Sequence, residues 1–207
     1  GAGDSLTTGV RDTAIGVNAA TAVTTENDVT AVGNNALAAN TASGNTAVGS
    51  GALDVNTTGV RNTAVGLDAL GANLVAADNT AVGSSALLLS TGANNTAVGS
   101  TALDANTTGA GNTAVGANAL SASSTSDNAT AIGVNALALN TAADNVAVGA
   151  NAADANTTGT ANVAVGTDAL GANQTGLNNT AVGNHALLLA TGSSNTGVGA
   201  QALDALT

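Results

Sequence analysis

The sequence predicts an all-β fold, a parallel β-roll or β-solenoid of about twelve coils with 16–17 residues each. Three observations lead to this prediction. A pentapeptide close to Asn45-Thr46-Ala47-Val48-Gly49 recurs along the chain, Gly punctuates the sequence at regular intervals, and Phe, Tyr, Trp, Met, Cys and Pro are all absent. Internal self-similarity at a short, fixed period is typical of repeat architectures.

The closing Gly of the pentapeptide defines the coil length. Its spacing runs 17, 16, 17 and then repeats, so three coils make 50 residues and the chain holds four 50-residue super-repeats. The closing glycines are Gly16, Gly33, Gly49, Gly66, Gly83, Gly99, Gly116, Gly133, Gly149, Gly166, Gly183 and Gly199. The repeats predict a single domain over residues 1–207. Neither end carries an atypical polar repeat, so we expect both ends to be uncapped and to meet further chain or other subunits.

Each pentapeptide predicts a short strand. Thr46-Ala47-Val48 favours β structure, and the flanking Asn45 and Gly49 favour turns. A helix is disfavoured although Ala is abundant, because the Gly fixed in every coil costs about 1 kcal/mol relative to Ala inside a helix.

An Ala-Leu pair follows the pentapeptide after two turn residues, as in Ala52-Leu53. The coil length suits two short strands and two turns. We therefore expect parallel ladders in which successive coils stack about 4.8 Å apart.

The predicted strand is apolar on both faces. Side chains alternate along a strand, so Ala47 points to one side, and Thr46 and Val48 point to the other. The Ala position is replaced only by Gly197, which indicates a tight interior site. A strand that is apolar on both faces is normally covered on both. Because a thin roll has one interior, we expect another copy of the chain to cover the second face.

Charge excludes several classes of partner. Two Arg and no Lys accompany 13 acidic residues, and the net charge is −11. Nucleic acids and anionic membrane surfaces need clustered basic residues, so neither is an expected partner. No apolar run reaches the 18 residues that a membrane-spanning helix needs. Without Cys, disulfides and thiolate metal sites are excluded.

Residues for catalysis are scarce, and we expect a non-enzymatic protein without cofactor or metal. His185 is the only His, and its repeat position predicts a solvent-exposed turn. The Gly-rich turns lack the Gly-Lys-Ser/Thr of phosphate-binding loops. Asp54, Asp104, Asp154 and Asp204 occupy equivalent positions three coils apart. That separation of about 14 Å is too long for one Ca²⁺ shell, although a site shared between chains of a trimer stays open.

Two further columns have predicted roles. The Asn that opens the pentapeptide is expected to form a structural ladder of stacked amides, as in cross-β structures. A regular Thr column on a flat face is also compatible with ice binding, although Val146 and Val163 interrupt it. The asparagines are Asn45, Asn62, Asn79, Asn95, Asn112, Asn145, Asn162, Asn179 and Asn195.

The repeats resemble the head repeats of trimeric autotransporter adhesins of the Yersinia-adhesin type. Their motif is close to Ser-Val-Ala-Ile-Gly, and it is matched by Thr-Ala-Ile-Gly at residues 13–16 and 130–133 and by the Asn-Thr-Ala-Val-Gly copies. The resemblance implies a left-handed parallel β-roll that trimerises and adheres to matrix, cells or other bacteria. The coils here are longer than the family's, and the chain shows no neck, stalk or anchor. Phage tail-fibre repeats are also similar.

From these residues and this resemblance we expect a homotrimeric, adhesin-like head or fibre module, extracellular or on a cell or virion surface. Its partners would be itself and matrix or cell-surface receptors. A structural filament whose subunits stack head to tail is the alternative, and an ice-binding solenoid is the third hypothesis.

Overall fold

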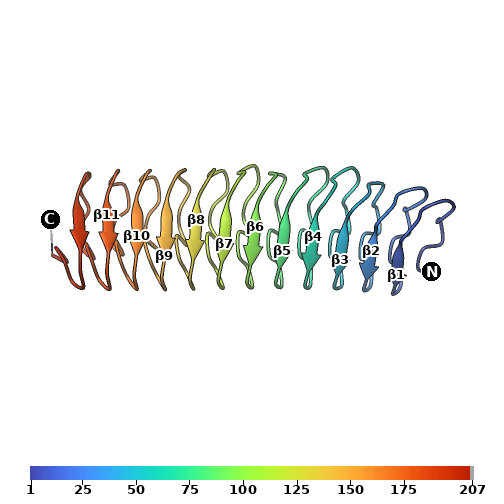
Figure 1. Cartoon of the computed structure of the whole chain (residues 1–207), viewed down its shortest axis with the longest axis horizontal. Coiled ribbons are helices and arrows are strands. Elements are labelled where there is room, and N and C mark those ends of the chain that lie inside the picture. Colours follow the sequence, from blue (N-terminus) through green and yellow to red (C-terminus); the bar gives the residue numbers. More distant parts are fainter. Residues whose placement is uncertain (206–207) are drawn as a thin grey trace.

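The computed structural model describes residues 1–205 as one continuous rod of stacked coils (Figure 1). Twelve strands form a single parallel sheet, and their order in the sheet is their order in the sequence. The described residues contain no helix. The predicted all-β solenoid is therefore confirmed. The roll is continuous over these residues, and the last two residues of the predicted domain, Leu206 and Thr207, lie outside the described part.

Every strand has three residues and coincides with the centre of a pentapeptide. The strands are β1 (Thr13–Ile15), β2 (Thr30–Val32), β3 (Thr46–Val48), β4 (Thr63–Val65), β5 (Thr80–Val82), β6 (Thr96–Val98), β7 (Thr113–Val115), β8 (Thr130–Ile132), β9 (Val146–Val148), β10 (Val163–Val165), β11 (Thr180–Val182) and β12 (Thr196–Val198).

The register keeps equivalent residues side by side. Thr46 pairs with Thr63, Ala47 with Ala64, and Val48 with Val65. The same pairing holds from β1 to β12. As a result, each position of the repeat forms a straight column along the rod.

The prediction of two strands per coil is wrong, because each coil contains one strand and the Ala-Leu segment turns instead of extending. Asp68 and Leu70, on either side of Ala69, have left-handed φ values of 53° and 51°. Leu53 and its equivalents share this conformation. A left-handed residue costs about 1–2 kcal/mol. Burying a Leu side chain returns about 1.5–3 kcal/mol, so burial outweighs the strain.

The core is a narrow interior filled by Ala and Leu. Ala47, Ala52 and Leu53 have no exposed surface, and neither do most of their equivalents. A Cβ added at Gly197, in the inner row of the sheet, would lie 3.0 Å from Leu187 Cγ. The Leu column therefore spans the interior and meets the sheet from the opposite wall.

The closing Gly is required where the strand ends. Gly66 has φ +138°, and a Cβ there would lie 2.4 Å from the carbonyl oxygen of Gly83. Gly49, Gly83, Gly99 and Gly116 have the same left-handed φ and the same close approach to the next coil. No larger residue fits this column while the coils keep their spacing.

One turn absorbs the difference between coils of 16 and 17 residues. In the shorter coil, residues 41–44 link Asn40 to Asn45, whereas in the longer coil residues 57–61 link Asn56 to Asn62. The strands on both sides keep their register.

Candidate functional site

The outer side of the sheet presents two parallel rows of side chains along the rod. One row consists of the first residue of each strand, Thr or Val, and the other of the last residue, Val or Ile. We call these rows the outer sheet face. Val48 and Val82 are each 37% exposed, while Ala47 between the rows on the inner side is fully buried. Within one chain, the sheet is therefore covered on its inner side only.

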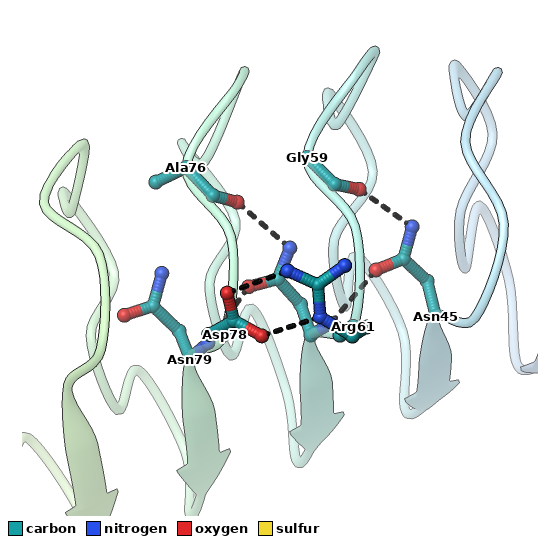
Figure 2. A network of polar contacts seen from close by, with 7 residues as sticks. Asn45, Gly59, Arg61, Ala76, Asp78 and Asn79 are labelled. Carbon is teal, nitrogen blue, oxygen red and sulfur yellow. Dashed lines mark hydrogen bonds and ion pairs between the residues drawn. The ribbon is translucent and has the colours of Figure 1, made fainter.

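The predicted Asn column is buried apart from the half-buried Asn195, and it joins each coil to the next (Figure 2). Asn45 Oδ1 accepts a hydrogen bond from the backbone N–H of Asn62 at 2.9 Å, and Asn45 Nδ2 donates to the Gly59 carbonyl at 2.7 Å. Asn62 repeats the pattern toward Asn79 and Ala76. The column is thus a ladder, but most of its bonds run from side chain to backbone rather than from amide to amide.

A second buried polar column was missed by the sequence reasoning. Asn56 Nδ2 donates to Asn40 Oδ1 at 2.7 Å, and Asn73 Nδ2 donates to Asn56 Oδ1 at 3.2 Å. The amide-to-amide stacking expected of the first column lies here. The available signal was an Asn or Ser five or six residues before the opening Asn. The members are Asn40, Asn56, Asn73, Ser90, Asn106, Ser123, Asn140, Asn156 and Asn173.

A third ladder lies on the surface, in the turn after the closing Gly. Asn118 donates to Asn135, Asn135 to Asn151, and Asn151 to Asp168. His185 approaches Asp168 from the opposite side, with Nε2 3.2 Å from Oδ2. His185 lies in a turn, as predicted, and its side chain is 37% exposed, with the contact to Asp168 as an addition that the sequence did not indicate.

The Asp column lies on the wall opposite the sheet and is half-buried. Burial raises the pKa of Asp54, Asp104 and Asp154 above the ordinary value of 3.8. The charges of Asp68 and Asp168 raise the pKa of Asp54 and Asp154 further. Residues 1–205 contain no group of three or more His, Asp or Glu side chains that is placed to hold a metal ion.

Both Arg side chains form ion pairs between neighbouring coils. Arg61 Nε and Nη2 donate to the two carboxylate oxygens of Asp78 at 2.6 and 2.8 Å (Figure 2). Arg11 forms the equivalent pair with Asp28. These groups are exposed, and exposed pairs contribute little to stability. In the third super-repeat, Gly111 and Asn128 occupy the equivalent positions.

Comparisons of the chain with protein-family models, curated proteins and solved structures found no match. Function is therefore inferred from geometry. The described residues enclose no pocket. No helix within residues 1–205 has the length and hydrophobicity needed to cross a membrane. The features available for contact with a partner are thus long rows of repeated side chains on the surface of a rod.

Proposed function

We propose that this chain is a non-enzymatic, rod-forming module of an extracellular adhesin-like head or fibre, and that it acts as a homotrimer. The outer sheet face carries this proposal. It is a straight apolar row of Val and Ile beside a row of Thr that Val146 and Val163 interrupt, continuous over twelve strands in register. Contiguous apolar surface of this extent is typical of interaction sites.

The core of each chain covers the inner side of its sheet, and association with other copies would cover the outer sheet face as well. Each Val removed from water contributes about 25 cal/mol for every Å² of apolar surface. Because the row repeats in every coil, this contribution grows with the length of the rod. Association through this face leaves the opposite wall, with its acidic turn positions, directed outward toward matrix or cell-surface receptors.

Molar mass tests the oligomer. Size-exclusion chromatography with light scattering needs refractive-index detection, because the chain has no Trp, Tyr or Cys to absorb at 280 nm. We expect a discrete mass of three chains. A monomer overturns the trimer. Particles of dispersed length identify the filament instead, and thermal hysteresis of a monomer identifies the ice-binding solenoid.

Substitution locates the interface. Val82→Lys together with Val98→Lys places two charges in the apolar row of the outer sheet face, and we expect it to yield monomers. Val75→Lys is the matched control, because Val75 is exposed but lies in a turn away from the sheet. Binding of the intact protein and of both variants to immobilised matrix proteins then tests adhesion. Equal mass for all three proteins rules out this interface.

A further inference from the structure

The row formed by the first residue of each strand is interrupted at one place along the rod. Ten of the twelve strands begin with Thr, and the neighbouring strands β9 and β10 begin with Val146 and Val163. These two residues lie side by side in the sheet, between Thr130 of β8 and Thr180 of β11. The interruption is therefore a single block that is two coils long.

This block is the most apolar part of the outer sheet face. Both outward positions of β9 and β10 carry Val, so four branched aliphatic side chains lie together, Val146, Val148, Val163 and Val165. Every other strand has Thr at one of its two outward positions. We call these four residues the Val block.

The rest of the outer sheet face distinguishes poorly between one coil and the next. The other ten strands all present Thr, followed by Val or Ile, to the outer side. The coils stack at a constant spacing of about 4.8 Å. Two copies displaced along the rod by one coil would therefore bring similar side chains level again, and would lose only the contacts of the outermost coils. Without the Val block, several axial registers would be close in free energy.

The strand hydroxyls make the Val block chemically distinct. Turn threonines such as Thr57 and Thr91 donate their hydroxyl hydrogen to a carbonyl of the next coil, at 2.9 and 2.7 Å. Within residues 1–205, by contrast, no strand Thr forms a side-chain hydrogen bond. Neighbouring hydroxyls in the row follow the coil spacing of about 4.8 Å, which is too long for a hydrogen bond between them.

Covering the outer sheet face would therefore leave its hydroxyls in need of partners from the covering chain. A half-buried Thr such as Thr63 or Thr80 can bond to water while the face is open. A buried hydroxyl without a partner is costly, so each covered Thr has to meet a polar group of another chain. The Val block has no such requirement, and it is best covered by apolar side chains.

We propose that the Val block fixes the axial register in which copies of this chain associate through the outer sheet face, an inference that rests on the proposed homotrimer. In a parallel arrangement without axial shift, Thr meets Thr at ten levels and Val meets Val at two. A shift of two or more coils opposes Val146 and Val163 to Thr of the other copies. The mismatch deprives hydroxyls of partners and separates the apolar side chains.

The Val block also distinguishes parallel from antiparallel association. Fully overlapping antiparallel rods would place β9 and β10 against β4 and β3, which begin with Thr63 and Thr46. Only the parallel, unshifted arrangement matches every level. A distinct residue in an otherwise uniform row sets the register of coiled coils in the same way.

A variant with a displaced block tests the register. Val146→Thr and Val163→Thr, combined with Thr80→Val and Thr96→Val, keep the composition and move the block from β9 and β10 to β5 and β6. Thr and Val have similar size and both favour strands, and all four positions lie on the outer side, so the core is unchanged. We call this protein the shifted variant.

Native mass spectrometry of co-expressed chains gives the result. Tagged wild type, carrying a short mass tag, should form trimers with untagged wild type in binomial proportions. With the untagged shifted variant, mixed trimers should fall at least about ten-fold below those proportions, because hydroxyls at four levels lose their partners. Binomial mixing with the shifted variant overturns the register role and leaves the homotrimer standing. A monomeric wild type overturns the homotrimer and this inference with it.

A variant with a uniform Thr row supplies a second test. Val146→Thr with Val163→Thr removes the block, and sedimentation velocity should then show a broad distribution of longer particles in place of the single wild-type boundary. Val55→Thr with Val75→Thr is the matched control, since both residues are exposed and lie in turns outside the outer sheet face. This control should sediment like the wild type. A uniform variant that sediments as one sharp trimer boundary overturns the proposal.

Discussion

Buried asparagines in this rod are satisfied by the coil that follows, and Asn106 shows the effect of a mismatch. Asn106 Oδ1 is buried and has no hydrogen-bond partner among residues 1–205. Its equivalents Asn56 and Asn156 accept hydrogen bonds from Asn73 and Asn173. The next coil has Ser123 instead.

Ser123 is engaged elsewhere, because its hydroxyl bonds to that of Ser126. The double variant Ser123→Asn, Ser126→Ala reproduces the Asn73 and Ala76 pair found 50 residues earlier. We expect it to raise the free energy of unfolding by about 1–3 kcal/mol, because a buried acceptor gains a donor. Urea unfolding followed by circular dichroism measures the change. Ser126→Ala alone is the control and should bring no gain.

At the scale of the element, the turn that ends each strand depends on its Gly. Gly66→Ala forces a Cβ against the Gly83 carbonyl in a left-handed conformation, and we expect a loss of more than about 4 kcal/mol. Gly192→Ala is the contrast, since its Cβ would meet only Asn195 Nδ2 at 3.4 Å and its φ is not left-handed. That change should stay within about 1 kcal/mol of the wild type. Similar losses for both variants would contradict this account.

The turns on the opposite wall make stability depend on pH. The pKa of Asp54, Asp104 and Asp154 is raised, so the folded chain holds these protons more tightly than the unfolded chain does. Proton binding by these carboxyls therefore stabilises the folded chain fully at pH values below their ordinary pKa of 3.8. This stabilisation is lost as the pH rises through their pKa in the folded chain. The triple Asp→Asn variant should therefore melt at a higher temperature than the wild type at neutral pH.

This advantage of the triple variant should shrink as the solution is acidified, because the wild-type carboxyls then become neutral as well. Asp78→Asn should change the melting temperature at neutral pH in the opposite direction. The hydrogen bond from Arg61 lowers the pKa of Asp78, so removing this carboxylate should reduce stability at neutral pH, by a small amount because the pair is exposed. Melting curves at several pH values measure both variants. A triple variant that is less stable than the wild type at neutral pH would show that these carboxylates are favourably placed.

The strands could be predicted from the sequence, but the conformation of the opposite turns could not. Thr46-Ala47-Val48 and Gly49 were predictable because a β-branched run and a fixed Gly each favour one backbone conformation. Leu53 was not, since Leu seldom adopts φ of 50°, and only its complete burial explains that it does so here. The second Asn column could have been found from the Asn or Ser five or six residues before each opening Asn. The contact between His185 and Asp168 could not, because it depends on which turns stack together in space.

At the scale of the whole molecule, the three-coil period predicts which shortened rods remain stable. Deleting residues 67–116 removes β5, β6 and β7 and brings β4 against β8 in an equivalent setting. Deleting residues 67–83 alone removes only β5. The 17-residue deletion also places Asp54 in the position next to Leu88 that Gly71 occupies in the wild type. A Cβ built at Gly71 would lie only 3.2 Å from Leu88 Cδ1, so the side chain of Asp54 would crowd Leu88.

We expect the 50-residue deletion to fold and to melt a few degrees below the wild type, because solenoid stability is roughly a sum over neighbouring repeats. The 17-residue deletion should melt at a lower temperature than the 50-residue deletion, although it retains more coils. Circular dichroism melting curves of both proteins decide the order. The reverse order would show that coil number outweighs the match between neighbouring coils.

The parallel register of the sheet has a mechanical consequence. The hydrogen bonds between coils point along the rod, so a pull on its two ends loads the outermost rung first, and the coils peel away one after another. Each released coil of 16–17 residues adds up to about 55 Å of extended chain. Such a rod would extend in many small, nearly equal steps, and would absorb a sudden load along a fibre without failing at a single point.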